Sequence, residues 1–285
     1  MRYEAPRSLD AAIALLGSSE GSTKILAGGT DLLVQLRTDM IEPDLVVDIK
    51  KIDETRSIVE TADGFVVGAA VSAAELNEHE GFAAAWPGVA EAAWLIGSTQ
   101  IMGRASLGGN LCNGSPAADS VPAMIAAGAT ANVASRQGLR QVRVEDVMVG
   151  PRKLSIGPDE FIVSFRFPAR PHRSGDAYQR FIPRTEMDIA VVGCGVNVIV
   201  APDGTIADAR VALGAVAERP LLVPAAADAI IGTSLDEEAL AALDAAARAA
   251  CRPIDDKRGT RQFRVQVAGV LARRVAELAY DRAGS

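Results

Sequence analysis

Two glycine pairs constrain this chain more than any other feature of its sequence. Gly28-Gly29 and Gly108-Gly109 lie about 80 residues apart, each between apolar segments and among small hydroxyl and amide side chains, with almost no basic residues inside the two segments. Glycine adopts the left-handed backbone region and lets a ligand approach the main chain closely. The two segments therefore predict a pyrophosphate held by backbone N–H groups, as in a site for a dinucleotide cofactor.

The composition allows a large buried core and argues against nucleic-acid binding. A chain of 285 residues with 49% hydrophobic content is expected to form one large domain or two modest ones. The net charge is -7, and no basic cluster exceeds short pairs such as Arg273-Arg274. Residues 1–6 lack a signal-peptide pattern, and the longest apolar run, residues 189–201, is shorter than the roughly 18 residues of a membrane helix. We therefore expect no transmembrane segment and a cytoplasmic protein.

The cysteines and histidines lack metal-binding spacings. Cys112, Cys194 and Cys251 are far apart, and the two histidines are His79 and His172. This spacing does not support a zinc site or an iron–sulfur cluster built by this chain alone. We interpret the cysteines as small buried hydrophobic residues rather than as redox groups.

The first part of the chain is expected to alternate strands and helices. We predict a helix over residues 8–16 that ends at Gly17, a strand over 24–27, a helix over 31–37 and a strand over 45–49. This order places the N–H groups of the first glycine loop at the start of a helix, where an anion is favoured. Further predicted elements are two strands around Asp63-Gly64 within 57–71, helices over 72–78, 82–96 (broken or restarted at Pro87) and 120–127, and strands over 130–135, 141–144 and 160–167.

A second domain is expected after a change of composition at residues 168–175, which are typical of a linker. Beyond it we predict strands of a meander over 177–182, 189–200 and 209–216, and then helices over 236–251 and 260–280. The boundary is placed near residue 172. The expected domains are 1–172, with subdomains of about 1–55 and 56–172, and 173–285.

Other nucleotide motifs fit poorly. Gly193-Cys194-Gly195 begins a Gly-x-Gly-x-x-Gly pattern, but position 198 is Val and the segment lies within a predicted strand. A P-loop sequence is absent. The second glycine segment, in contrast, carries more donors and acceptors than a simple turn needs, and apolar neighbours would bury them. These polar residues are Ser106, Asn110, Asn113, Ser115 and Asp119.

Residues 27–32 and 106–111 resemble the FAD-binding loops of the molybdenum hydroxylases. The similarity is to the medium, flavin-carrying subunit of carbon monoxide dehydrogenase and its relatives, and to the FAD domain of xanthine dehydrogenase. Residues 3–9, 100–105, 184–190 and 256–264 resemble further segments of that family, in the same order along the chain. The resemblance implies an α+β fold, with a two-part FAD-binding domain of the vanillyl-alcohol-oxidase (PCMH) type followed by a small α+β C-terminal domain.

The resemblance also implies positions for the cofactor. The pyrophosphate would be wrapped by Leu26, Ala27, Gly28, Gly29, Thr30, Asp31 and Leu32 and covered by Ala105, Ser106, Gly108, Gly109 and Asn110. Asp119, with Asn113 nearby, would accept hydrogen bonds from the polyol or ribose. Ile96, Gly97 and Ile101 would border the adenine or ribose, and Phe161 or Ile162 would lie against the isoalloxazine ring.

By the same resemblance, this chain is an electron-transfer subunit and contributes no catalytic residue to the hydroxylation. A small subunit with [2Fe–2S] clusters would deliver electrons to its FAD, a large molybdopterin subunit would bind the organic substrate, and an external acceptor would take the electrons. The assembly would be a dimer of heterotrimers, with any membrane association made through the complex. Neither histidine lies beside a glycine loop, so non-covalent FAD is expected.

Two alternatives stay open from the sequence. One is a stand-alone FAD oxidoreductase of the same fold, which would need substrate anchors such as Arg184, Glu186, Arg258 and Arg261 in its second domain. The other is a nucleotide-binding scaffold without redox activity. Bound flavin would exclude the scaffold, and co-purifying iron–sulfur and molybdenum subunits would favour the electron-transfer subunit over the stand-alone enzyme.

Overall fold

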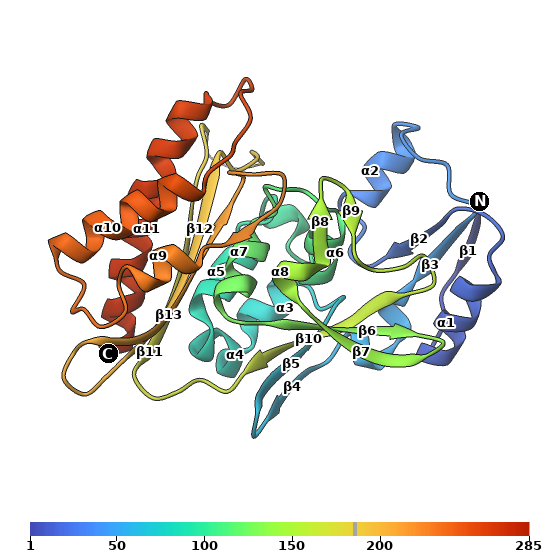
Figure 1. The fold of residues 1–285 in the computed structure, drawn as a ribbon. Helices are drawn as coiled ribbons and strands as arrows, with labels where there is room; N and C mark the ends of the chain where they lie inside the picture. The colour runs from blue at the N-terminus through green and yellow to red at the C-terminus, as the bar shows by residue number, and fades with distance from the viewer. Residues whose placement is uncertain (185–186, 285) are drawn as a thin grey trace.

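The computed structural model describes residues 1–184 and 187–284 and begins with a small parallel sheet (Figure 1). Its strands are β1 (Arg2–Glu4), β2 (Thr23–Leu26) and β3 (Leu45–Asp48), in the order β1-β3-β2. Helix α1 (Leu9–Ser18) connects β1 to β2, and α2 (Leu32–Arg37) follows β2. We expected α1 to stop before Gly17, but it includes Gly17 and Ser18. Its last turn is closed by Ser19, whose N–H donates to the carbonyl of Leu16.

A five-stranded antiparallel sheet follows, in the order β4-β5-β10-β6-β7. Its strands are β4 (Ile58–Thr61), β5 (Gly64–Gly68), β6 (Thr130–Ser135), β7 (Gly138–Arg143) and β10 (Phe161–Pro168). The short helical turns η1 (Ile49–Lys51) and η2 (Asp53–Thr55) lead into it. The expected hairpin around Asp63-Gly64 is confirmed by the register Thr61–Gly64. β7 begins three residues before the expected strand because Ser135 pairs with Gly138 across a tight turn.

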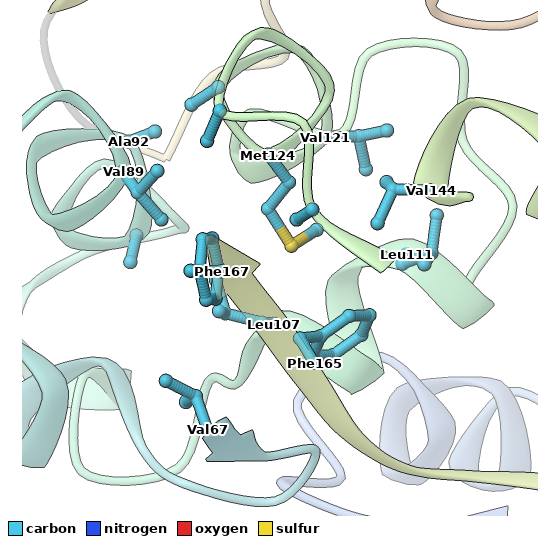
Figure 2. Packing of buried hydrophobic residues seen from close by; sticks show 14 of the residues in the cluster. Val67, Val89, Ala92, Leu107, Leu111, Val121, Met124, Val144, Phe165 and Phe167 are labelled. Atoms are coloured by element: carbon cyan, nitrogen blue, oxygen red, sulfur yellow. The ribbon is translucent and has the colours of Figure 1, made fainter. Parts of the chain in front are cut away.

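Helices cover this sheet and form the first core (Figure 2). They are α3 (Ala73–Glu78), α4 (Glu80–Ala85), α5 (Pro87–Trp94), η3 (Thr99–Ile101), α6 (Leu107–Cys112), α7 (Ser120–Ala126) and α8 (Val144–Val147), followed by the hairpin β8 (Met148–Gly150) and β9 (Lys153–Leu154). Leu107 and Leu111 of α6 pack with Met124 and Phe165 in this core. Pro87 opens α5, a position that suits its missing N–H, so the expected helix over 82–96 forms as two helices.

The last part of the chain is an antiparallel meander covered by helices (Figure 1). Its strands are β11 (Ser174–Phe181), β12 (Val192–Val200), β13 (Ile206–Gly214) and β14 (Leu221–Leu222), and its helices are α9 (Pro224–Asp228), α10 (Glu237–Ala250) and α11 (Arg261–Gly284). The meander is confirmed, but pairing shifts its ends. Val192 pairs with Phe181, so the apolar residues 189–191, expected in the strand, lie outside it. The expected linker overlaps the end of β10 and the start of β11.

The meander packs against helices on both faces. Helices α10 and α11 form a second core with one face of the sheet, in which Leu271 of α11 joins Val196 and Val211 of the strands. The other face lies against α5 and α7 (Figure 1). Gly195 of β12 permits this close approach, because a Cβ there would lie 2.7 Å from the carbonyl oxygen of Pro122. The sheet is therefore buried between the helices of the first part and its own.

Candidate functional site

The two glycine segments contact each other. A Cβ added at Gly28 would overlap the carbonyl oxygen of Arg104 and lie 3.3 Å from the amide nitrogen of Ala105. The loop that follows β2 is therefore packed directly on the residues that lead into α6. Two segments separated by about 80 residues in the sequence are thus adjacent in the fold.

The first segment presents unpaired N–H groups. Gly29 has a φ of 81°, a left-handed conformation that favours glycine. Its carbonyl accepts a hydrogen bond from Leu33 N at 2.9 Å, which begins α2. Within the described part of the chain, the N–H groups of Gly28, Gly29, Thr30 and Asp31 donate to no protein acceptor. A curved backbone with successive free N–H groups is suited to an anion such as a phosphate.

The second segment is a helix rather than the expected loop. Ser106 is the N-cap of α6, and its Oγ accepts a hydrogen bond from Gly109 N at 3.1 Å. Leu107 and Leu111, one turn apart, are buried in the first core. The cap and this apolar pair outweigh the low helix propensity of two glycines. The left-handed conformation expected at both pairs occurs only at Gly29, since Gly28, Gly108 and Gly109 have negative φ.

Gly108 and Gly109 have different surroundings within α6. A Cβ on Gly108 would lie 2.5 Å from the carbonyl oxygen of Ala69, so this position holds the helix close to the end of β5. A Cβ on Gly109 would meet only Ser106 Oγ, at 3.2 Å. Position 109 is therefore less crowded than position 108, and the only close neighbour of an added Cβ is a side-chain atom outside the backbone.

The predicted polar residues of the second segment have partners in the protein. Asn110 Oδ1 accepts hydrogen bonds from Ser120 N at 3.1 Å and from Ser120 Oγ at 2.7 Å, which ties α6 to the start of α7. Asn113 Oδ1 accepts from Gln35 Nε2 at 3.3 Å, which ties α6 to α2. These two asparagines thus hold the helices around the glycine segments in place.

Asp119 is buried and pairs with the C-terminal sheet. Tyr178 OH donates to Asp119 Oδ1 at 3.0 Å, and Arg180 Nη1 donates to Oδ2 at 2.6 Å. Burial raises the pKa of Asp119 to about 6, although Arg180 and Tyr178 act to lower it. Sequence reasoning missed both partners. The sequence places residues 178 and 180 on one face of a predicted strand, but it carries no signal that this face meets Asp119.

The remaining predicted cofactor residues occupy two places. Ile96 is buried, Gly97 has a φ of 72°, and its carbonyl accepts from Met187 N at 3.3 Å. Ile101 is half-buried near them, and a Cβ on Gly97 would overlap its side chain. On β10, Phe161 packs in one core cluster with Ala27, whereas the adjacent Ile162 packs in the first core.

The three cysteines differ in their exposure. Cys194 and Cys251 are buried, as expected, whereas Cys112 at the end of α6 is exposed, which the interpretation as a buried hydrophobe did not anticipate. Desolvation by surrounding protein atoms nevertheless raises the pKa of the Cys112 thiol to about 12. A thiol with this pKa stays protonated at neutral pH. Among the described residues, no group of three His, Cys, Asp or Glu side chains is arranged to hold a metal ion.

Two family models together match almost the whole chain. Residues 1–170 match the FAD binding domain in molybdopterin dehydrogenase. Residues 177–279 match the CO dehydrogenase flavoprotein C-terminal domain. The chain belongs to the FAD-binding medium subunits of the carbon monoxide and xanthine dehydrogenase type. The expected fold class, a PCMH-type FAD-binding domain followed by this C-terminal domain, is confirmed.

Relatives and solved structures agree with the family over the full length. The chain is 32% identical to the carbon monoxide dehydrogenase medium chain of Hydrogenophaga pseudoflava, over 98% of this chain and 97% of the relative. It is 30% identical to the putative xanthine dehydrogenase FAD-binding subunit of Escherichia coli, over 99% and 97%. A solved structure of carbon monoxide dehydrogenase from H. pseudoflava superposes with a TM-score of 0.94 at 33% identity, over 99% of this chain and 98% of that one. These relatives are subunits of oxidoreductases.

The medium-subunit fold fits FAD at the glycine segments. The free N–H groups of residues 28–31 offer the donors that a pyrophosphate needs, and the close contact of Gly28 with Arg104 and Ala105 brings the start of α6 to the same loop. The residues considered as substrate anchors for a stand-alone enzyme are engaged elsewhere. Arg184 and Arg258 both pair with Asp188, and Arg261 pairs with Asp255. Glu186 lies outside the described residues.

None of the helices within residues 1–184 and 187–284 combines the length and the apolar character needed to cross a bilayer.

Proposed function

We propose that this medium subunit carries FAD non-covalently and transfers electrons within a molybdenum hydroxylase complex. A small partner with [2Fe–2S] clusters delivers the electrons, a large molybdopterin partner binds and hydroxylates the organic substrate, and an external acceptor takes the electrons from the FAD. The complex is a dimer of such heterotrimers in the cytoplasm. The observation that carries this proposal is the joined pair of glycine segments with free N–H groups.

The residues of this chain bind and orient the cofactor. Leu26 to Leu32 hold the pyrophosphate through the main chain, and Ala105, Ser106, Gly108, Gly109 and Asn110 cover it from α6. FAD, when bound, supplies the ability to accept and release electrons one or two at a time. Asp119, with Asn113, lies on the polyol or ribose side, Ile96, Gly97 and Ile101 on the adenine or ribose side, and Phe161 or Ile162 behind the ring. The protein keeps the cofactor oriented and its phosphates shielded from water.

A covalent link to FAD has no support from the two histidines. Nδ1 of His79 accepts a hydrogen bond from Phe82 N at 3.1 Å, which caps α4. His172 lies between β10 and β11, in the segment that joins the proposed domains 1–172 and 173–285. Acid precipitation of the complex is expected to release FAD into the supernatant. Flavin that stays with the precipitated protein would contradict non-covalent binding.

Stepwise reconstitution tests the electron-transfer role. The purified chain with bound FAD is mixed with the organic substrate of its complex, and flavin reduction is followed by absorbance. We expect no reduction at enzymatic rates by substrate with the chain alone, and rapid reduction once the iron–sulfur and molybdenum subunits are both present. Reduction of the isolated chain by a small organic substrate at about 1–10³ per second would establish the stand-alone oxidoreductase instead.

A further inference from the structure

A lysine outside the glycine segments contacts the first of them. Lys50 Nζ donates a hydrogen bond to the carbonyl oxygen of Ala27 at 2.8 Å and lies 2.8 Å from Asp48 Oδ1. Tyr3 OH donates to the other carboxylate oxygen, Asp48 Oδ2, at 2.6 Å. The Lys50 and Asp48 side chains are only 19% and 9% exposed. A partly buried ion pair is therefore directed at the first residue of the loop.

The hydrogen bonds of this network favour an ionised Asp48 and a neutral Tyr3. Burial acts to raise the pKa of Asp48, but hydrogen bonds from Lys50 and Tyr3 outweigh it and hold the pKa below its ordinary value. The hydrogen bond to Asp48 raises the pKa of Tyr3. At neutral pH, Asp48 is thus a carboxylate and Tyr3 a neutral phenol, and the lysine contributes the one positive charge of the network.

The contact with Ala27 reaches the cofactor side through a single peptide unit. The carbonyl of Ala27 and the N–H of Gly28 belong to one planar trans peptide, so they point in opposite directions. A cation at the carbonyl polarises this peptide and strengthens its N–H as a donor. The N–H of Gly28 is one of the free groups of the loop. The loop itself contains no cation and one carboxylate, Asp31, so any positive charge near its N–H groups comes from outside it.

We infer that Lys50 is a positioning residue for FAD, which fixes the first glycine loop and passes positive charge through the Ala27–Gly28 peptide to the pyrophosphate. This inference rests on the proposed function of the loop. Lys50 does not touch the cofactor in this arrangement. It acts through the main chain, with Asp48 and Tyr3 holding its ammonium group in place.

The neighbouring lysine provides a matched control. Lys51 lies in the same short helical turn, η1, but its side chain is exposed and forms no hydrogen bond or ion pair with the described residues. Lys50→Met and Lys51→Met remove the same charge from adjacent positions. Lys50→Arg restores the charge and the donors, and Lys50→Gln keeps a donor without the charge, which gives a second neutral variant if the methionine variant does not fold.

The test measures FAD binding by the purified full chain after its flavin is removed. FAD is titrated while its fluorescence is followed, and the melting temperature of each flavin-free variant is recorded. We expect Lys50→Met and Lys50→Gln to raise the Kd for FAD about tenfold or more, as for loss of a charge-assisted hydrogen bond. Lys50→Arg should recover most of the affinity, and Lys51→Met should stay within about twofold of the wild type.

The FAD affinities of these variants decide between the inference about Lys50 and the proposed function of the loop. Neutral variants of Lys50 that bind FAD as tightly as Lys51→Met would overturn the inference while leaving the proposed function intact. An equal loss of affinity in Lys50→Arg and Lys50→Met would also overturn it, because charge and donors would then not matter. A wild-type chain that does not bind FAD at all would refute the proposed function and this inference together.

Discussion

At the scale of single residues, the glycines of the site serve different physical purposes. Gly28 is required by close packing, since any side chain would overlap the carbonyl of Arg104. Gly29 is required by its left-handed conformation, with a φ of 81°. Gly109 satisfies neither condition, because it is helical and open on its outer side. If glycine proves necessary at position 109, a ligand beside α6 is the first explanation to test, because the only close neighbour of an added Cβ is Ser106 Oγ.

Gly28→Ala is expected to separate the two glycine segments. Its methyl group cannot fit against Arg104, so the loop must move and its N–H groups lose their alignment. We expect FAD affinity to fall at least tenfold, as measured by fluorescence titration. The control is Gly103→Ala, one residue from the same contact, where an added Cβ meets nothing within 4 Å. Similar losses in both variants would show that the contact with Arg104 does not position the loop.

Gly109→Val distinguishes an effect on FAD binding from an effect on the stability of the flavin-free protein. The flavin-free variant should melt within a few degrees of the wild type, because a Cβ at this position meets only Ser106 Oγ, a side-chain atom. FAD binding should nevertheless be lost if the pyrophosphate lies beside this position. Thermal melting of the flavin-free protein and FAD titration together decide the matter. Unchanged FAD affinity would place the cofactor elsewhere.

Glu160 gives the protein an acid-sensitive contact beside the proposed ring residues. Arg140 donates two hydrogen bonds to its carboxylate, at 2.8 and 2.7 Å, and these lower the pKa of Glu160 to about 2. A lowered pKa in the folded state stabilises the protein above the ordinary value of 4.5, and this stabilisation is lost as the pH falls from 4.5 toward 2. Arg140 is 42% exposed, which limits the contribution to roughly 1 kcal/mol.

Glu160→Gln should therefore be less stable than the wild type at pH 7 by up to about 1 kcal/mol, and the difference should shrink as the pH is lowered below about 4. Urea unfolding at several pH values measures both quantities. A difference that stays constant with pH would mean that the ion pair does not account for the effect of the substitution.

At the scale of elements, α6 shows what the sequence could and could not reveal. The glycine pair favoured a loop, yet Ser106, Leu107 and Leu111 follow the pattern of an N-cap and an apolar helix face. Local signals were sufficient for β6, whose bounds, Thr130–Ser135, match the prediction. The partners of Asp119 could not be found in the same way, because they depend on how the meander packs against α7. The contact of Lys50 with Ala27 also could not be predicted, because it depends on how η1 packs against the loop after β2.

Ser106→Ala should weaken α6 by about 1 kcal/mol, since Gly109 N would lose its capping acceptor. Urea unfolding of the flavin-free chain measures the loss. Ser106→Thr, which keeps a capping hydroxyl, should restore most of the stability. An equal loss in the threonine variant would indicate that crowding around this buried residue, rather than the cap, determines the effect.

At the scale of the whole molecule, the two regions matched by the family models meet at one buried sheet, the C-terminal meander. The meander carries its own core on the side of α10 and α11, and α5 and α7 cover its other side (Figure 1). Arg210 of β13 crosses this boundary and donates hydrogen bonds to the carbonyl of Ile125 and to Glu145. Tyr178 of β11 belongs to the core of the first part. Separating the two parts would break these hydrogen bonds and expose Tyr178 and Ala212, which are buried in the first core, and this is costly.

We therefore expect the full chain to unfold in one cooperative transition. Both tryptophans, Trp86 and Trp94, lie in the first part, so tryptophan fluorescence reports that part alone, whereas far-UV circular dichroism reports both. The two unfolding curves in urea should coincide. Gly195→Val provides the perturbed case, because its side chain would push α7 away from β12 and let the two curves separate. A wild-type circular dichroism curve with a second transition after the fluorescence change is complete would show that the C-terminal part is stable by itself. In that case the contacts across the sheet would join two independently stable domains.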